Sequence, residues 1–211
     1  MKTKHGINFE ESGIGEWLYD DVIITQSKNI ISSLASLKAE IINRSIKIDN
    51  IIEIGTYFGG FTLLLNDIFC RDSTVKEIHS FDISDYYRRF GANIHDVFRS
   101  RPSITFYSGD VFGNQQINTV INSGRCILIC DGGNKPKEFN YYSQFLKSGD
   151  IIMAHDYARD DEDFKDRVLG KIWNCKEIQY ADIQSAVLSN QLKPFVERDM
   201  ANSAMCCFQK E

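Results

Sequence analysis

The chain has 211 residues, of which 43% are hydrophobic, and its formal net charge at pH 7 is -5. This length and composition can bury the core of one domain, and no Gly/Ser-rich or repetitive stretch marks a linker. The acidic balance lacks the basic footprint that nucleic-acid-binding proteins carry, so a nucleic-acid partner is not expected.

The sequence shows no apolar run of membrane length and no signal peptide, so we expect a cytoplasmic protein without a membrane partner. Its six cysteines lack the paired spacing of a metal site. Cys126 and Cys130 alternate along one predicted strand, and Cys206 and Cys207 fall in a late one. We interpret them as core thiols in a reducing compartment. The sequence leaves open whether the chain forms a homo-oligomer.

The chain opens with a lead that contains Trp17 and Tyr19, and a helix is predicted over about residues 26–45. Isoleucine and leucine recur along this helix near helical spacing, which predicts that one face packs on a sheet. These residues are Ile30, Ile31, Leu34, Leu37, Ile41 and Ile42. We assign residues 1–47 to the lead and covering helix, and residues 48–211 to the core of the same structural domain.

The most informative segment covers residues 51–60 and reads Ile-Ile-Glu-Ile-Gly-Thr-Tyr-Phe-Gly-Gly. Its apolar start predicts a buried strand. Gly55, Gly59 and Gly60 predict a tight turn in which a Cβ would obstruct the backbone or a ligand. The apolar residues 61–69 then predict a helix that packs back on the strand. Such a corner binds nucleotides in doubly wound α/β sheets, although glycine is also common in purely structural turns of this kind.

Each of the three strands predicted next leads to an acidic residue. The strands cover residues 79–82, 104–107 and 126–130, and the acids are Asp82, Asp110 and Asp131. Together with Glu53, these acids fall at one edge of the predicted sheet. A single strand-end acid is most often a helix cap, but four in register indicate a ligand site. There Asp82 can accept hydrogen bonds from both ribose hydroxyls of an adenine nucleoside, and Asp110 can accept one from the adenine amine.

The spacing after Glu53 resembles that of class I S-adenosylmethionine-dependent methyltransferases. Residues 53–60 read acid-x-Gly-x-x-x-Gly-Gly, as in that family, and lack the Gly-x-Gly-x-x-Gly spacing of dehydrogenases. The difference is physical, because a dinucleotide needs backbone amides for its pyrophosphate. S-adenosylmethionine has no phosphate and carries a sulfonium and an ammonium, which suit an electronegative sheet edge.

Residues 131–137 and 147–157 are similar to a bacterial branch of this family. The branch contains small-molecule and sugar O-methyltransferases and cephalosporin-hydroxylase-like proteins, and the resemblance covers about residues 48–180. The chain departs from the branch at Asn134, where a histidine is common, so a catalytic role of that histidine cannot be transferred. The turn before the fifth strand retains its glycine at Gly149.

The resemblance implies an α/β fold with a Rossmann-like, doubly wound sheet of seven strands and helices on both faces. The implied strand order is 3-2-1-4-5-7-6, with strand seven antiparallel. From the sequence we expect residues 177–182 and 204–209 to form the last two strands. We also expect a helix over residues 138–146 and a solvent-exposed helix start at residues 158–166.

The resemblance further implies that S-adenosylmethionine is the cofactor and that the acceptor is a small molecule or a sugar hydroxyl. The implied cofactor-binding residues are Glu53, Gly55, Tyr57, Gly59, Gly60, Asp82, Ile83, Gly109, Asp110 and Asp131. Tyr57 is expected at the methionine end of the cofactor, and Tyr157 is expected to be a wall of the pocket.

Methyl transfer from a sulfonium to an oxygen is an in-line displacement that needs the acceptor held close and its proton removed. Asp131, His155 and Asp156 follow strands four and five and are the candidate catalytic residues. They can hold Mg²⁺ or another divalent cation that lowers the pKa of a bound hydroxyl, although a histidine ligand suits manganese, iron or zinc better. His155 can instead act as a general base, or order the loop by hydrogen-bonding Asp131.

Two other functions remain open. One is a cephalosporin-hydroxylase-like oxidoreductase, but the turn lacks a pyrophosphate cradle, and the triad of an iron oxygenase needs a second histidine near His155. The other is a catalytically inactive binding protein with the methyltransferase fold, which the loss of a histidine at Asn134 keeps open. Retention of the four strand-end acids argues against loss of cofactor binding.

Overall fold

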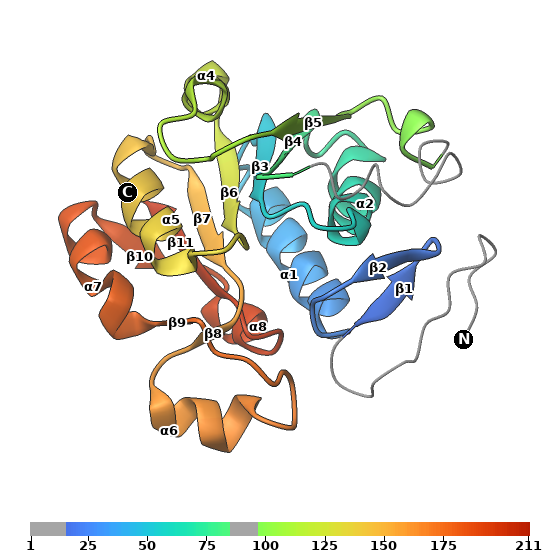
Figure 1. Ribbon diagram of the computed structural model, residues 1–211. Helices are drawn as coiled ribbons and strands as arrows, with labels where there is room; N and C mark the ends of the chain where they lie inside the picture. Colours follow the sequence, from blue (N-terminus) through green and yellow to red (C-terminus); the bar gives the residue numbers. More distant parts are fainter. Residues whose placement is uncertain (1–15, 85–96) are drawn as a thin grey trace.

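A seven-stranded mixed sheet forms the centre of the computed structural model, which describes residues 16–84 and 97–211 (Figure 1). Its strands are β3 (Asn50–Ile54), β4 (Glu77–Asp82), β5 (Ile104–Ser108), β6 (Cys126–Cys130), β7 (Ile151–Ala154), β10 (Leu192–Pro194) and β11 (Cys206–Lys210). Their order is β10-β11-β7-β6-β3-β4-β5, and β11 is antiparallel to both of its neighbours. Numbered along the chain, this is the predicted order 3-2-1-4-5-7-6 with strand seven antiparallel, so the predicted fold is confirmed.

Two small sheets flank the large one. Strands β1 (Trp17–Tyr19) and β2 (Val22–Ile24) form an antiparallel hairpin, and β8 (Tyr157–Ala158) pairs in parallel with β9 (Ile178–Gln179). The hairpin packs against the start of the helix that follows β3. The lead of the chain therefore lies beside the turn that carries the glycine pattern.

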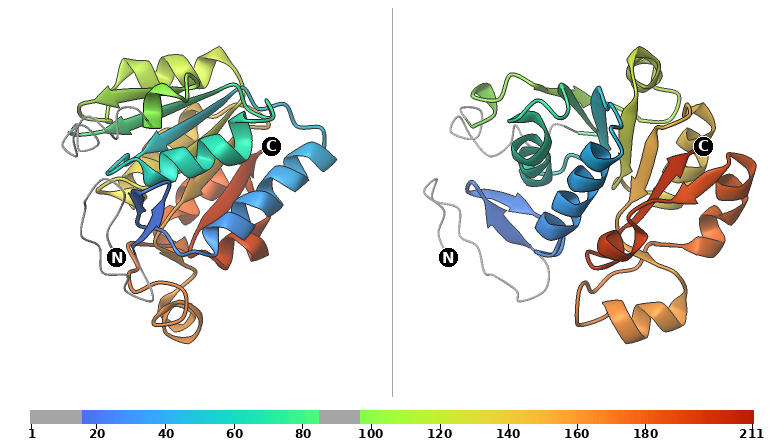
Figure 2. Two further views of the ribbon diagram at one scale, coloured as in Figure 1. Left: turned by 90° about the vertical axis from the view of Figure 1, so that its right-hand side faces the viewer. Right: turned by 180° about the vertical axis from the view of Figure 1, so that it is seen from behind.

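Helices cover both faces of the sheet (Figure 2). One layer contains α1 (Ile30–Asn43), α2 (Gly60–Leu65) with the π-helical turn Asn66–Cys70, and α8 (Glu197–Ala201). The other contains α4 (Gln115–Ser123), α5 (Lys135–Tyr142) with the 3-10 turn Ser143–Phe145, and α7 (Tyr180–Ser189). The short helix α6 (Asp161–Asp163) runs into a π-helical turn, Phe164–Val168, and Asp160 caps its start as the acidic sequence predicts.

Successive residues of the central strands enter different cores. In β6, Ile127 and Ile129 pack with the α1 layer, whereas Leu128 and Cys130 pack with the α5 layer. Side chains alternate across a strand, and both faces of this sheet are covered, so each position is buried. This explains why the central strands appear in the sequence as continuous apolar runs.

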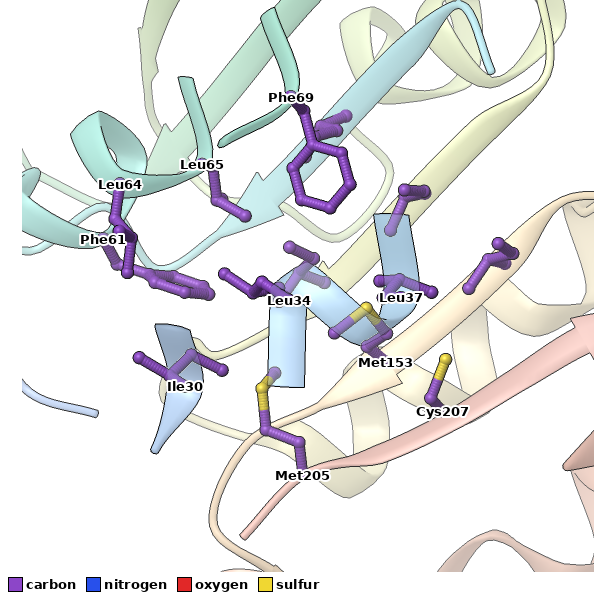
Figure 3. Packing of buried hydrophobic residues seen from close by; sticks show 14 of the residues in the cluster. Ile30, Leu34, Leu37, Phe61, Leu64, Leu65, Phe69, Met153, Met205 and Cys207 are labelled. Carbon is purple, nitrogen blue, oxygen red and sulfur yellow. The ribbon is translucent and has the colours of Figure 1, made fainter. Parts of the chain in front are cut away.

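Helix α1 is shorter than predicted and buries a narrower face. Leu34 and Leu37 are fully buried and belong, with Phe61 and Phe69, to the core between the sheet and the α1 layer (Figure 3). Each such leucine contributes roughly 1.5–3 kcal/mol to stability by leaving water. Ile31 and Ile42, which the prediction placed on the same face, are 44% and 55% exposed, because adjacent positions on a helix diverge by about 100°.

The predicted strand at residues 177–182 is wrong. Only Ile178 and Gln179 are extended, and they pair with β8 outside the large sheet. Asp182 accepts a hydrogen bond from the backbone amide of Gln179 at 2.8 Å, which satisfies an amide at the start of α7. The sixth strand is instead β10, three residues at the sheet edge that end in Pro194, a residue that edge strands tolerate.

Helix α5 begins three residues before the predicted start. The side chain of Asn134 accepts a hydrogen bond from the Lys137 amide at 3.1 Å, and Pro136 lies in the first turn. Asn134, which departs from the branch pattern, therefore serves as the helix cap. Phe139 and Tyr142 are buried as predicted, whereas Phe145 is 37% exposed.

All six cysteines are free. Cys126, Cys130, Cys206 and Cys207 are buried in the sheet, as predicted for core thiols, and Cys175 is exposed. None of the helices in the described part of the chain combines the length and the apolar character needed to cross a bilayer.

Candidate functional site

A cavity of about 650 Å³ opens at the carboxyl ends of β3, β4, β5, β6 and β7. It lies where the strand order reverses between β3 and β6, the place where open α/β sheets bind their ligands. Its volume suits a small-molecule site. The predicted site residues that line it are Gly55, Tyr57, Asp82, Ile83, Gly109, Asp110, Asp131, His155 and Asp156.

Glu53 is not among the lining residues. Glu53 lies two residues after Ile51 in β3, so its side chain points to the same face of the sheet, the face that α2 covers. There its Oε2 accepts hydrogen bonds from the hydroxyls of Thr62 (2.5 Å) and Ser80. Burial raises the pKa of Glu53 to about 8, although these two hydrogen bonds work in the opposite direction. A cofactor contact of Glu53 stays a prediction, and in this structure its side chain joins β3, β4 and α2.

Gly59 and Gly60 also lie outside the lining. A Cβ added at Gly60 would lie 2.2 Å from the carbonyl oxygen of Ile23 in β2. Gly59 has a φ of +82°, and a Cβ there would meet the Phe98 ring at 2.6 Å. Within this structure the two glycines allow the hairpin and Phe98 to approach the start of α2.

Gly55 brings two parts of the site together. It has a φ of +98°, and an added Cβ would lie 2.1 Å from the carbonyl oxygen of Asp131. The amide of Asp131 donates a hydrogen bond to the carbonyl oxygen of Ile54 at 2.9 Å, and this bond also keeps the two loops close together. A glycine at position 55 thus lets the turn after β3 lie directly against the loop after β6.

We expect Gly55→Ala to lower the free energy of unfolding by about 1–3 kcal/mol from backbone strain, with a further loss from the contact with Asp131. Denaturant unfolding followed by circular dichroism measures this change. Gly133→Ala is the matched control, because a Cβ there meets nothing within 4 Å. Equal stability of the two variants would contradict the packing described for Gly55.

Asp82 and Asp110 face the cavity and also hold their own loops. Asp82 Oδ2 accepts a hydrogen bond from the Tyr57 amide at 2.8 Å, and its Oδ1 accepts one from the Ser84 amide at 3.2 Å. Asp110 Oδ1 accepts one from the Phe112 amide at 2.9 Å. Both acids therefore act as loop caps, and their lining positions leave a contact with a ligand open to them as well.

Apolar side chains stand beside these two acids. Ile83 is 76% exposed and Tyr57 is 40% exposed, and both line the cavity with Val111 and Phe112. An aromatic ring placed between the two acids would cover this apolar surface. Tyr157, by contrast, is buried and lies outside the lining, so the structure does not place it as a pocket wall.

At the β7 side of the cavity the structure brings the three predicted catalytic residues together. The Nδ1 atom of His155 lies 3.3 Å from Asp131 Oδ1 and 3.3 Å from Asp156 Oδ1. His155 and Asp156 are consecutive, yet both line the cavity. The chain leaves the strand at this point, where Asp156 has a φ of +57°.

Two further charged residues, Lys135 and Glu177, complete this cluster, and neither was predicted from the sequence as a site residue. The ammonium of Lys135 lies 2.7 Å from Glu177 Oε2, 2.9 Å from Asp156 Oδ2 and 3.5 Å from Asp131 Oδ1. It also donates to the carbonyl oxygen of Gly132 at 3.2 Å. A lysine spaced four residues after a strand-end acid was a signal for Lys135, whereas Glu177 is distant in sequence and gave none.

The lead of the chain reaches the same cluster. Gln26 follows the β1–β2 hairpin, and its Nε2 donates to Asp131 Oδ2 at 2.5 Å. The Gln26 side chain is buried, and its Oε1 has no hydrogen-bond partner within the described residues. Residues of the lead thus help to position a predicted catalytic carboxylate.

The charges of the cluster shift one another's pKa values. Burial alone would lower the pKa of Lys135, but the carboxylates of Asp131, Asp156 and Glu177 raise it overall. Burial likewise opposes the shifts of His155 and Asp156, yet the His155 pKa is raised by the two carboxylates, and the Asp156 pKa is lowered by His155 and Lys135. Lys135 is therefore a firm ammonium at neutral pH.

The two ring nitrogens of His155 have different surroundings. Its Nδ1 faces the two carboxylates, whereas its Nε2 is buried and has no hydrogen-bond partner within the described residues. The Trp173 ring contacts the imidazole edge to face, with centroids 5.1 Å apart. A histidine held in this way by carboxylates has the arrangement of a general base.

The same cluster is the predicted metal site. Asp131, His155 and Asp156 each offer one ligand atom, and these atoms lie within 4.8 Å of one another, a spacing that a small cation can bridge. Asp156 Oδ1 has no hydrogen-bond partner within the described residues. However, the Lys135 ammonium contacts Oδ2 of the same carboxylate and lies 3.5 Å from Asp131 Oδ1, so an ion bound by both carboxylates would lie against a positive charge. As arranged, these residues do not fit a divalent metal, and the metal prediction is not confirmed.

No protein-family model matches the sequence, and no curated protein matches it significantly. Solved structures are similar in fold. The apo structure of CmcI-N160 has a TM-score of 0.60 and 10% identity, with 92% of this chain and 76% of that chain covered. The CMeT domain structure of the citrinin polyketide synthase has a TM-score of 0.55 and 13% identity, with 86% and 52% covered.

A third structure is a Staphylococcus aureus protein assigned as a caffeoyl-CoA O-methyltransferase. Its TM-score is 0.54 at 13% identity, with 84% of this chain and 83% of that chain covered. The present chain spans about half the length of the citrinin synthase structure and most of the other two. These likenesses show a Rossmann-like fold that this chain shares with the three proteins, and the resemblance to the bacterial branch stays a prediction.

Proposed function

We propose that the protein is an S-adenosylmethionine-dependent methyltransferase that methylates a hydroxyl oxygen of a small molecule or sugar. The observation that carries this proposal is the single cavity that joins Asp82 and Asp110 to the cluster of Asp131, His155 and Asp156. The first pair suits a nucleoside, and the cluster suits proton removal from an acceptor. The shared methyltransferase fold supports the proposal.

In this proposal the residues at the ends of β4 and β5 would hold the nucleoside of the cofactor. Asp82 accepts hydrogen bonds from the ribose hydroxyls and Asp110 from the adenine amine, with Ile83 and Phe112 beside the ring. The turn at Gly55, which lies against the loop of Asp131, would hold the methionine end. The negative charge of the cluster favours a cationic cofactor over a phosphate-bearing one.

When bound, S-adenosylmethionine supplies an electrophilic methyl group on its sulfonium. The chain's own residues prepare the acceptor: His155 accepts the proton of the acceptor hydroxyl at Nε2, and the Lys135 ammonium holds Asp131 and Asp156 beside the imidazole. Asp131 and Asp156 face Nδ1 and stabilise the imidazolium that results. His155 must be neutral before this step, and the carboxylates that raise its pKa make it a stronger base.

The two alternative functions have less support. The group of potential metal ligands that the described residues form contains one histidine, whereas the triad of an iron oxygenase has two. An inactive binding protein would retain the nucleoside acids but would not need a histidine with an unpartnered nitrogen against two carboxylates. Binding of the cofactor without any turnover would favour that alternative.

The proposal is tested by calorimetry with S-adenosylmethionine and S-adenosylhomocysteine. We expect micromolar binding to the wild type and a loss of about 1–3 kcal/mol for Asp82→Ala, since the ribose hydroxyls and the Tyr57 amide lose their acceptor. Asp166→Ala is the matched control, because Asp166 is an exposed acid outside the cavity. Absence of binding of either ligand to the wild type would overturn the proposal.

A further inference from the structure

The Lys135 ammonium is held by four oxygen atoms from three parts of the chain. Glu177 precedes β9, Asp156 follows β7, and Asp131 and the carbonyl of Gly132 follow β6. The Lys135 side chain is only 6% exposed. Burial of an ammonium is costly unless its charge and its donors are satisfied, and this cage supplies both.

The position of Lys135 in its own helix is unfavourable. It is the first residue of α5, where the unsatisfied backbone amides give the helix end a partial positive charge. Acidic residues suit that end better, and Glu138 in the same turn accepts hydrogen bonds from the amides of Gly132 and Asn134 at 3.1 Å. Helix formation therefore does not account for Lys135, whereas the three carboxylates do.

The ammonium and a divalent ion would compete for the same two carboxylates. Lys135 takes Asp156 Oδ2 at 2.9 Å and lies 3.5 Å from Asp131 Oδ1, and Asp131 Oδ2 accepts from Gln26. A small divalent ion needs carboxylate oxygens at about 2.0–2.2 Å with their lone pairs free. Asp156 Oδ1 has no hydrogen-bond partner within the described residues, but an ion that binds it together with Asp131 Oδ1 would lie beside the ammonium and be repelled by its charge.

We propose that Lys135 is the resident cation of this site and occupies the place between Asp131 and Asp156 that a divalent metal would take. The exclusion of a metal follows from the position of the ammonium and does not depend on the proposed function. The role of the ammonium in holding these two carboxylates beside the proposed base His155 does rest on that function. The site accordingly works without a divalent metal.

The test is Mn²⁺ binding, measured by electron paramagnetic resonance and calorimetry on the full chain. The wild type is expected to bind no stoichiometric Mn²⁺ in this cluster. Lys135→Met is expected to bind it at least about 100-fold more tightly, because removal of the positive charge frees two carboxylates. Adding Asp131→Asn to that variant should abolish the gain. Lys165→Met, which removes an exposed lysine outside the cavity, should behave as the wild type.

Two results would overturn the assignment of Lys135. One is stoichiometric Mn²⁺ binding to the wild type that Asp131→Asn removes, and the other is a folded Lys135→Met protein that gains no affinity. Lys135→Gln keeps a hydrogen-bond donor without the charge and replaces Lys135→Met if the latter does not fold. S-adenosylmethionine calorimetry on the same samples reports the proposed function separately, since Mn²⁺ affinity needs no cofactor.

Discussion

Replacing His155 by glutamine is expected to lower kcat for methyl transfer by about 10²–10⁴-fold and to leave the affinity for S-adenosylmethionine nearly unchanged. Glutamine can still donate a hydrogen bond toward Asp131 or Asp156, so the cluster keeps its packing. It cannot take up a proton at the position of Nε2, the nitrogen that has no partner within the described residues. Steady-state kinetics and cofactor calorimetry on the same protein separate these two effects.

His79→Gln is the matched control for this experiment. His79 is nearly buried in β4, contacts Tyr107 and Glu77, and lies outside the cavity lining. Its replacement should leave kcat within a few-fold of the wild type. If His155→Gln instead keeps kcat but loses stability, His155 is a structural residue that orders the loop after β7, and the general-base role is wrong.

The second large effect is on stability and comes from Glu53. Burial raises the pKa of this carboxyl from 4.5 to about 8 in the folded protein, so the folded state keeps a proton that the unfolded state releases above pH 4.5. The free energy of unfolding should therefore fall as the pH rises from 5 to 8, by up to about 4 kcal/mol at about 1.36 kcal/mol per pH unit. Below pH 4.5 both states are protonated, and this contribution to stability is complete.

Glu53→Gln should remove this dependence, because the amide is neutral at every pH and its oxygen can still accept from Thr62 and Ser80. We expect the variant to match the wild type near pH 5 and to exceed it at pH 8 in denaturant unfolding. Glu162→Gln, at an exposed position of α6, controls for the loss of an ordinary glutamate. Parallel pH profiles of wild type and Glu53→Gln would show that Glu53 is ionised in the folded state.

The sheet was predictable because its strands are apolar and end in recognisable residues. The strand predicted at residues 126–130 has the same first and last residue as β6, because a five-residue apolar run followed by Asp-Gly-Gly has clear boundaries. Strand β10 was missed because Leu-Lys-Pro carries neither length nor alternation, and its pairing with β11 depends on the tertiary fold. The strand predicted at residues 177–182 was wrong because helix α7 starts within it, with Gln179 as the cap residue and Asp182 accepting from the Gln179 amide.

The acids that line the cavity were predictable from their positions at the strand ends, but the prediction for Glu53 ignored the alternation of side chains along a strand. Asp82, Asp110 and Asp131 follow the last apolar residue of a strand, whereas Glu53 precedes Ile54 and so points to the helix layer. Alternation along the strand could have separated these cases from the sequence alone.

Local sequence patterns could not predict how the remaining members of the cluster come together, although the spacing of Lys135 from Asp131 was a signal for that residue. Glu177 and Gln26 reach Lys135 and Asp131 only after the chain has folded, and neither residue lies in a distinctive motif. Lys135 was visible next to the branch motif, but lysine is most often exposed, and nothing local shows that three carboxylates surround it. Charged clusters of this kind are properties of the tertiary structure.

Two separate structural requirements restrict which residue can occupy position 156. The turn with a φ of +57° favours asparagine, aspartate or glycine, and the cluster around Lys135 favours a negative charge. Aspartate alone meets both requirements, so few substitutions at this position are expected to be tolerated. Asparagine would preserve the chain path and discard the charge, and a β-branched residue would lose both. In an evolving lineage, a change from aspartate to asparagine here would mark a protein that keeps its shape after selection on its chemistry has relaxed.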